Sequence, residues 1–263
     1  MPKYLEMNKR SIWALPYFIF MVLFVVLPLV MIFIYAMQDN AGHFSLANLG
    51  KFFSDKDALG TFALSIEVAI ENTLLCILIG YPAAYILADK KLNRSAVTVV
   101  LFILPMWINA LMRTLATAEL FTMAGVPLGK GTLLFGMCYD FLPFMIYPIY
   151  NVLNKMDKSY AEAAQDLGAK PSEVFRKVTL PLSMPGVWSG VMMVFMPTVS
   201  TFAISEFLTN NKIKLFGTII QENINNSMWN YGAALSLIML VIIGVTTLLQ
   251  KGDTDNEAVG GVI

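Results

Sequence analysis

Six apolar stretches alternate with polar segments along the chain. They occupy residues 12–37, 66–88, 96–116, 132–153, 187–209 and 231–249. Each is close to the ~20 residues that a helix needs to cross ~30 Å of hydrocarbon. The pattern therefore predicts an all-α, polytopic membrane protein with six transmembrane helices.

The first apolar stretch follows Lys9 and Arg10, as the core of a signal peptide would. However, it is longer than the ~7–15 apolar residues of a signal core, and no small-residue cleavage site follows it. We therefore expect an uncleaved first span.

The lysine and arginine residues of the loops indicate the orientation of the spans. If the N-terminus lies inside, most of these cations fall on the inner side, including Lys9, Arg10 and Lys90. The loop cations left on the outer side are Lys51, Lys56, Lys130, Lys212 and Lys214. This asymmetry predicts that both termini lie in the cytoplasm.

The composition agrees with a lipid environment. Hydrophobic residues make up 57% of the chain and charged residues 14%, against about 25% charged residues in ordinary soluble domains. The formal net charge is zero, and no basic block offers an electrostatic footprint for nucleic acid. Cys76 and Cys138 lie inside apolar runs without metal-binding spacing, so we interpret them as small buried residues.

The segment 154–186, between the fourth and fifth apolar stretches, carries its own helix signals. Ser159 and Glu162 have the spacing of a capping box, and Gly168 can take the left-handed conformation that ends a helix. Pro171 suits the first turn of a new helix, which Pro181 and Pro185 would then stop. The segment therefore predicts two short helices joined by a sharp glycine turn on the inner face.

These residues also carry a resemblance to a known family. Glu162-Ala163-Ala164, then Gly168, then Val178-x-Leu180-Pro181 resembles the "EAA" loop of ABC importer permeases, with valine where the family usually has isoleucine. Further segments resemble spermidine/putrescine permeases of the PotB type: Gly80-Tyr81-Pro82-Ala83-Ala84-Tyr85, Leu104-Pro105-Met106-Trp107-Ile108-Asn109 with Arg113-Thr114, 142–148 and 180–186. Together they cover about residues 64–250.

The resemblance implies a type I (MetI-like) permease domain over 1–263, with its core at 64–250, in the bacterial plasma (inner) membrane. It implies that the loop couples the spans to a cytoplasmic ABC ATPase dimer through Glu162, Ala163, Ala164, Gly168, Leu180 and Pro181. A second, homologous permease subunit and an extracytoplasmic polyamine-binding protein would complete the importer. ATP and Mg would bind the partner ATPase, and this chain itself would carry no cofactor, metal or catalytic residue.

Ionised side chains inside the spans are the candidates for a cargo pathway. A charge at mid-bilayer costs about 2.5–3.5 kcal/mol on insertion scales, so one is expected where it has a use or a partner. Glu71, Arg113, Asp140 and Glu206 fall within the apolar stretches or at their ends. Salt bridges to Arg113 and snorkelling to the headgroups are the alternatives to a role in transport.

We select Glu206 first and Asp140 second as pathway acids. Glu206 follows several hydroxyl residues on the fifth span, which borders the pathway in the family that the chain resembles. Trp107, Tyr139 and Tyr147 could stack on alkylammonium groups, or they could be residues of the interfacial belt.

Other function classes have weaker support. The sequence Gly125–Thr132 lacks the glycine and the hydroxyl residue that a phosphate loop requires, and a single histidine excludes a HExxH zinc site. A secondary transporter would normally show more spans, often as repeats. A polyamine is the expected cargo; ferric iron, a sulfur oxyanion and ion-coupled transport are the alternatives.

Overall fold

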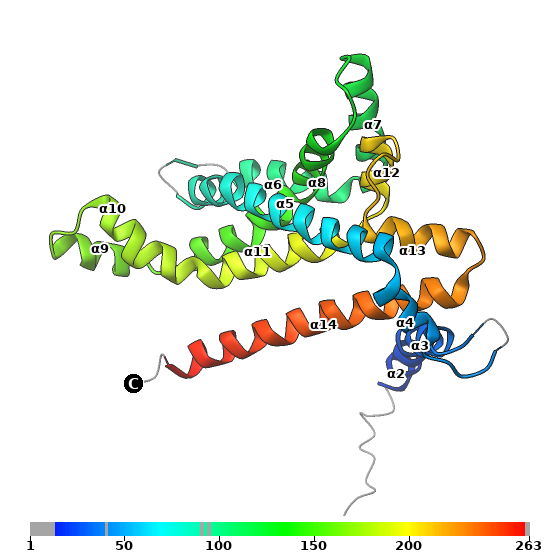
Figure 1. The fold of residues 1–263 in the computed structure, drawn as a ribbon. Coiled ribbons are helices and arrows are strands. Elements are labelled where there is room, and N and C mark those ends of the chain that lie inside the picture. The colour runs from blue at the N-terminus through cyan, green and yellow to red at the C-terminus, as the bar shows by residue number, and fades with distance from the viewer. Residues whose placement is uncertain (1–13, 40–41, 90–91, 94–95, 261–263) are drawn as a thin grey trace, which may run out of the picture. The chain divides into compact units, whose positions relative to one another are not determined.

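The computed structural model describes residues 14–39, 42–89, 92–93 and 96–260, and in these residues every named element is a helix (Figure 1). The start of the first predicted span lies outside them, as do Lys9, Arg10 and Lys90 of the orientation argument. The elements from the N-terminus to the hairpin are α2 (Leu15–Met21), η1 (Val22–Val26), α3 (Leu27–Ala36), α4 (Ala47–Ser54), α5 (Lys56–Ala88), α6 (Ala96–Ile103), η2 (Leu104–Trp107), α7 (Ala110–Met123), α8 (Lys130–Lys155) and α9 (Ser159–Asp166). The remainder are α10 (Pro171–Val174), η3 (Phe175–Thr179), α11 (Leu180–Ser200), α12 (Ala203–Thr209), α13 (Phe216–Asn225) and α14 (Trp229–Gly260).

Among the described residues, five helical stretches are long and apolar enough to cross a membrane, and a bent pair of helices makes a sixth candidate. The five are Leu15–Ala36, Lys56–Ala88, Lys130–Lys155, Pro171–Ser200 and Trp229–Thr247; the bent pair is Val97–Trp107 with Ala110–Met123. The prediction of an all-helical protein is confirmed, and its six predicted spans are reached if the bent pair counts as one span. The bounds of several spans differ from those expected.

The third span is not the continuous helix predicted over 96–116. Its two halves meet at 92°. Ile108 is extended, and the side chain of Asn109 accepts hydrogen bonds from the backbone N–H groups of Leu111 and Met112 at 2.9 and 3.4 Å. Asn109 is thus an N-cap that starts a new helix, after a 3₁₀ turn that contains Pro105.

The fifth span is broken as well, although not at the prolines expected to end the hairpin. Pro181 and Pro185 lie inside a helical stretch that runs from Pro171 to Ser200, so the expectation that they stop it is wrong. The N–H of Leu180 bonds to the carbonyl of Phe175 in a π turn just before Pro181, a local widening that lets a helix pass a proline. The predicted span 187–209 instead breaks at Thr201, which is extended.

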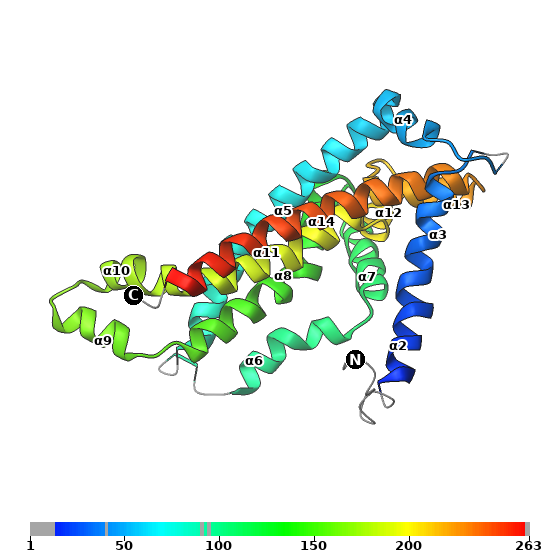
Figure 2. The ribbon, with the colours of Figure 1, turned by 90° about the horizontal axis from the view of Figure 1, so that it is seen from below.

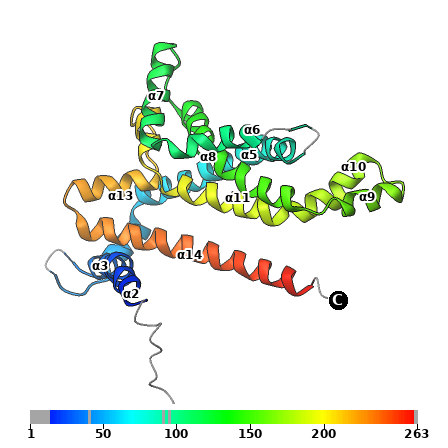
Figure 3. The same cartoon turned by 180° about the vertical axis from the view of Figure 1, so that it is seen from behind.

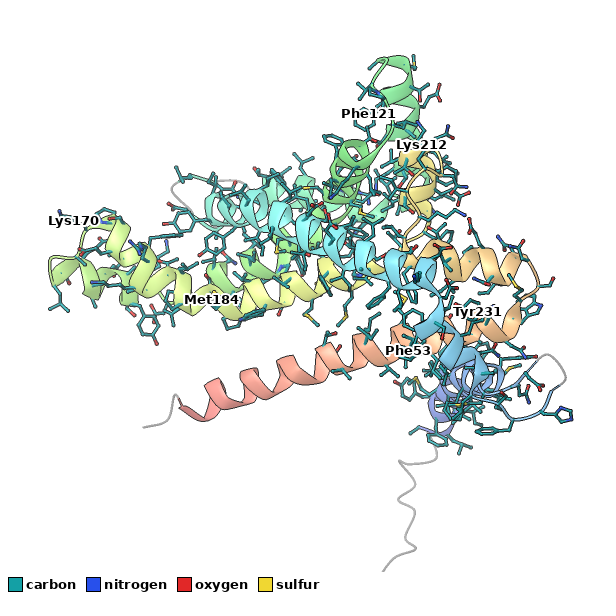
Figure 4. The ribbon with its side chains drawn as sticks, in the orientation of Figure 1. Phe53, Phe121, Lys170, Met184, Lys212 and Tyr231 are labelled. Carbon is teal, nitrogen blue, oxygen red and sulfur yellow. The ribbon has the colours of Figure 1, made fainter. Side chains whose placement is uncertain are left out.

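The chain forms two compact units: Met1–Lys56 with Ile220–Ile242, and Asp57–Ile219 with Ile243–Ile263. In the first unit, Ala36 packs with Ala233 and Ala234. The hydroxyl of Tyr231 donates to Asp55 at 3.0 Å, and the ammonium of Lys51 lies 4.2 Å from the centre of the Tyr231 ring. Phe53 lies on α4 in the same unit (Figure 4).

The core of the second unit is the packing of α5, α8 and α11, which lie side by side in each view (Figures 1 and 2). Met145 of α8 is fully buried between two glycines. A Cβ atom added at Gly80 of α5 would lie 2.9 Å from its side chain, and one added at Gly190 of α11 would lie 2.7 Å from its sulfur. These glycines allow the three helices to approach closely, as small residues do in membrane bundles.

The two ends of the second unit carry different structures. At one end, α9 and α10 form a helical hairpin, with Lys170 at its tip (Figures 2 and 4). At the other end, α7 and α12 pack on each other and on the first turns of α8 (Figure 3). We call residues 159–174 the hairpin, and the region of α7, α12 and the start of α8 the opposite end.

Candidate functional site

The turn of the hairpin is built by Gly168. Its φ is +84°, a left-handed conformation that costs glycine little. The N–H of Gly168 bonds to the carbonyl of Gln165 at 2.8 Å, and that of Ala169 bonds to Ala164 at 3.1 Å. This pair of bonds is the Schellman motif, so the predicted glycine turn between two short helices is confirmed.

The hairpin begins with a different cap from the predicted one. The N-cap of α9 is Lys158, and the carboxylate of Asp157 accepts from the N–H of Ser159 at 3.0 Å. The capping box of Ser159 with Glu162 is therefore wrong. The hydrogen bonds from Ser159 lower the pKa of Asp157, because they favour its charged form. The second helix starts as expected at Pro171, where Glu173 caps the N–H of Lys170.

The hairpin exposes or half-exposes its residues, with the exception of Val174, which is buried at its end. No residue of α9 is buried, and Leu167 is 90% exposed. Glu162, Ala163 and Gly168 are exposed, Ala164 is half-buried, and the later motif residues are half-buried (Leu180) or exposed (Pro181). An exposed leucine beside small alanines on a short helix is a surface that another protein can cover.

Aromatic and hydroxyl contacts join the hairpin to the spans. Phe175 packs edge-to-face against Tyr81 and Tyr85 of α5, with ring centres 5.9 and 5.7 Å apart. The hydroxyls of Tyr81 and Ser183 lie 2.8 Å apart, so α5 and α11 are linked just behind the hairpin. A force on the hairpin would reach both helices through these contacts.

The opposite end brings Arg113 of α7 and Asp140 of α8 together. Nη2 of Arg113 lies 2.9 Å from Oδ1 of Asp140, and the two side chains are 6% and 2% exposed. The hydroxyl of Thr114 donates to Oδ2 of Asp140 at 3.0 Å. The guanidinium also lies 5.4 Å from the centre of the Tyr139 ring. Asp140 and Tyr139 therefore both lie at this buried ion pair.

The remaining pathway candidates lie elsewhere. Glu206 is half-buried in the first turn of α12, Trp107 is 85% exposed at the end of η2, and Tyr147 is exposed on α8. Within the described part of the chain, their side chains form no ion pair, ring contact or hydrogen bond with the Arg113–Asp140 pair. Their assignment to a pathway stays a prediction.

A second ion cluster, between α5 and α8, was not predicted from the sequence. Nζ of Lys130, at the start of α8, lies 2.7 Å from Glu67 and 2.9 Å from Glu71 of α5. Glu71 therefore pairs with Lys130 and not with Arg113. The spacing of Glu67 and Glu71 by one helical turn is a sequence signal for a shared cation, but nothing in the sequence identifies Lys130 as that cation.

The chain is similar to known membrane components of transport systems. The family model described as "Binding-protein-dependent transport system inner membrane component" matches residues 7–252. "Spermidine/putrescine transport system permease protein PotB" of Escherichia coli (strain K12) is 29% identical over 253 residues, with 87% of this chain and 92% of that protein covered. The Haemophilus influenzae protein of the same name is 30% identical over 199 residues, with 69% and 70% covered.

A solved structure is similar over nearly the whole chain. It is a bacterial ABC transporter involved in the import of the acidic polysaccharide alginate, with a TM-score of 0.66 and 17% sequence identity. The match covers 95% of this chain and 99% of that one. At this identity the likeness shows a common fold.

Proposed function

Because the chain belongs to the family of binding-protein-dependent transport system inner membrane components, we propose that it is the permease subunit of an ATP-driven importer of polyamines such as spermidine and putrescine. It is a multi-pass protein of the inner membrane with the all-α, MetI-like fold of ABC importer permeases. The observation that carries the proposal is the exposed hairpin with the Glu162–Gly168 motif at one end of a bundle of apolar helices.

The hairpin is the proposed contact with the ATPase. Its exposed face would dock on a cytoplasmic ATPase dimer, with Glu162, Ala163 and Ala164 at the contact and Gly168 setting the angle between its two helices. Leu180 and Pro181 continue the hairpin directly into α11, so movement at the ATPase would be carried into that span. ATP and Mg would bind only the partner.

The remaining partners follow from the same proposal. A second, homologous permease would complete the pathway, and an extracytoplasmic binding protein would deliver the cargo at the opposite end. Both termini and the hairpin would then lie in the cytoplasm.

The relatives named for spermidine and putrescine support a polyamine as the cargo. Polyamines carry ammonium groups separated by methylenes, so their pathway needs acids that are not already neutralised. Glu206 fits this need better than Asp140, because no cation of the described residues lies within ion-pair distance of it, whereas Asp140 is paired with Arg113. Glu206 is therefore the first choice for the pathway.

Reconstituted transport tests the proposal. The complete importer in proteoliposomes should take up labelled spermidine with ATP, and should take up none when the ATPase subunit is left out. Glu206→Gln keeps the size and removes the charge, so uptake should fall while ATPase activity still responds to the loaded binding protein. Stimulation by a binding protein loaded with ferric iron or a sulfur oxyanion, but not with a polyamine, would reject the cargo. ATPase-independent uptake would indicate an ion-coupled carrier.

Cysteine labelling tests the orientation. In a Cys76→Ala, Cys138→Ala background, Leu92→Cys should resist an impermeant thiol reagent in intact cells, and Ala47→Cys should react with it. Both positions are exposed in the structure, so access to the membrane side decides the result. Labelling of Leu92→Cys from outside would place the hairpin on the wrong side for an ATPase.

A further inference from the structure

The two cysteines of the chain meet inside the second unit, although 62 residues separate them in the sequence. Cys76 lies on α5 and Cys138 on α8, and their Sγ atoms are 3.8 Å apart. Both are free thiols. The sulfur atoms of a disulfide are about 2.0 Å apart, so the two thiols need a further approach of less than about 2 Å to be joined.

The Cys76 thiol is also one step of a polar chain that crosses three helices in the apolar bundle. Its Sγ lies 3.8 Å from Oδ1 of Asn72, and the side-chain amide of Asn72 donates to the hydroxyl of Thr198 on α11 at 2.9 Å. Cys76, Asn72 and Thr198 are 0% exposed. A thiol is a weak donor, so the contact between α5 and α8 at this level can break and form again.

The two thiols differ in their access to an oxidant. Cys138 is half-buried, whereas Cys76 is fully buried behind it, so a small oxidant meets Cys138 first. Its product, a sulfenic acid, condenses with a second thiol to give a disulfide. Cys76 is in contact with Cys138 and is therefore placed to react before the sulfenic acid is oxidised further, to a form that is not readily reduced.

We propose that Cys76 and Cys138 form an oxidation site, at which a hydroperoxide joins α5 to α8 through a reversible disulfide that slows transport. In the first step, the sulfur of Cys138 attacks the terminal oxygen of the hydroperoxide. The O–O bond breaks, and the leaving alkoxide takes the thiol proton and becomes an alcohol. In the second step, the sulfur of Cys76 attacks the sulfenic sulfur. The S–S bond forms, and the hydroxyl group leaves with the Cys76 proton as water. The two thiols lose two electrons, which the hydroperoxide gains.

The disulfide would act on the coupling between the hairpin and the spans. The helix α8 leads into the hairpin, while α5 reaches it through the contacts of Tyr81 and Tyr85 with Phe175. A covalent bond would prevent α5 and α8 from shifting relative to each other when the hairpin moves. Oxidation also removes the thiol hydrogen that the buried Oδ1 of Asn72 can accept. The effect on transport rests on the proposed function, whereas formation of the disulfide does not.

Alkylation tests whether the disulfide forms. The complete importer in proteoliposomes is treated with tert-butyl hydroperoxide, which enters bilayers, and is then unfolded and treated with N-ethylmaleimide. Both cysteines of this chain should be protected, and its intact mass should fall by two hydrogen atoms; dithiothreitol should reverse both changes. Free thiols after treatment, added oxygen without loss of hydrogen, or a disulfide to another subunit would each overturn the proposal.

Uptake of labelled spermidine measures the consequence. Each protein is compared with its own untreated sample. Wild type should lose uptake in proportion to the disulfide formed and recover it with dithiothreitol. Cys138→Ser and Cys76→Ser cannot form the bond and keep a polar donor of similar size, so both should retain their uptake after treatment. The two variants give independent controls if one of them folds poorly.

The outcomes separate this inference from the proposed function. A disulfide in wild type without loss of uptake would show that α5 and α8 need not shift, and equal losses in wild type and the serine variants would place the damage elsewhere; either result rejects the inference. If untreated wild type takes up no spermidine, the cargo is wrong. Alkylation then still decides whether the disulfide forms, and the ATPase rate of the same samples, before and after dithiothreitol, decides whether it slows the importer.

Discussion

The hairpin and the opposite end of the same helical unit are stabilised by different kinds of interaction. The hairpin is shaped by hydrogen bonds between residues close in sequence, such as Ala169 to Ala164 and Ser159 to Asp157. The opposite end is held by contacts between distant residues, of which the Arg113–Asp140 ion pair is buried and the Lys130 cluster is partly exposed. A region held by local bonds can keep its shape while its surface stays free for a partner.

Because the two ends are stabilised differently, mutations in the hairpin and at the opposite end should have different consequences. Changes at the opposite end remove buried partners or add atoms to packed helices, so they should lower stability first and transport as a result. Changes in the hairpin affect few tertiary contacts, so they should reduce transport while the protein remains folded. Both stability and transport should therefore be measured for each variant.

The largest expected effect is the loss of one partner of the buried ion pair. Arg113→Leu leaves the carboxylate of Asp140, which is 2% exposed, without its cation. Removal of one partner from a buried pair typically costs about 3–5 kcal/mol. The thermal midpoint of the purified protein in detergent should fall steeply, together with the yield of folded protein.

The double variant Arg113→Leu, Asp140→Leu is the decisive control. It removes both charges, so most of the lost stability should return if the cost arises from an unpaired buried carboxylate. A double variant as unstable as Arg113→Leu alone would instead show that the guanidinium matters for packing against Tyr139.

A second, smaller loss of stability is expected at the break in the fifth span. A Cβ atom at Gly217 would clash with the carbonyl oxygen of Ser200 and would lie 2.8 Å from that of Thr201. Gly217→Ala must therefore displace the backbone at the break, at a cost of about 1–3 kcal/mol. Gly60→Ala is the matched control, because no atom lies within 4 Å of its added Cβ. Equal thermal midpoints for the two variants would contradict the close approach of Gly217 to the carbonyl groups of Ser200 and Thr201.

The same contrast explains which features could be predicted from the sequence. The glycine turn and the start at Pro171 follow from conformational preferences of single residues, and both are confirmed. The cap at Asp157 was missed because Ser159 offered an equally good local pattern; the two alternatives differ by a shift of the helix start that periodicity does not resolve.

Long-range features could not be predicted in this way. Asn109 is a good N-cap residue, but in an apolar run nothing signals that the helix should turn by 92° there. Likewise, the sequence offered Arg113 as a partner for several acids, and its choice of Asp140 depends on how α7 turns against α8 after that break. Hydrophobicity identifies a span without fixing its rotation or its kinks.

The third prediction concerns the hairpin, where function should respond more than stability. Gly168→Val places a β-branched residue at φ +84°, which costs about 1–2 kcal/mol locally. No atom lies within 4 Å of the added Cβ, so the fold should survive while the two helices change their angle. Uptake should fall at least tenfold at unchanged abundance in the membrane.

Gly168→Asn is the matched control for backbone strain. Asparagine tolerates the left-handed conformation better than other residues with a side chain, so it should retain much of the uptake. If both variants transport normally, the turn is not part of the transmission element. If both fail equally, the side chain blocks docking and the strain is not the cause.

The smallest effect is expected at the exposed ion cluster. Lys130→Met removes a cation that bridges Glu67 and Glu71, but all three side chains are between 37% and 56% exposed. Water and salt can therefore replace most of the lost interaction. The thermal midpoint should fall by no more than about 2 °C. Lys212→Met is the control, since Lys212 is exposed at the same end (Figure 4) and forms no ion pair with the described residues.

The response to salt should distinguish the exposed Lys130 cluster from the buried Arg113–Asp140 pair. Raising the salt concentration shortens the range of electrostatic interactions between exposed charges and has much less effect on buried ones. The difference between wild type and Lys130→Met should therefore vanish in high salt, whereas the difference between wild type and Arg113→Leu should persist. A Lys130→Met effect that is large and independent of salt would mean that the cluster is shielded from solvent. In that case, both ion pairs at the opposite end would act as buried structural contacts, and the contrast would lie only between that end and the hairpin.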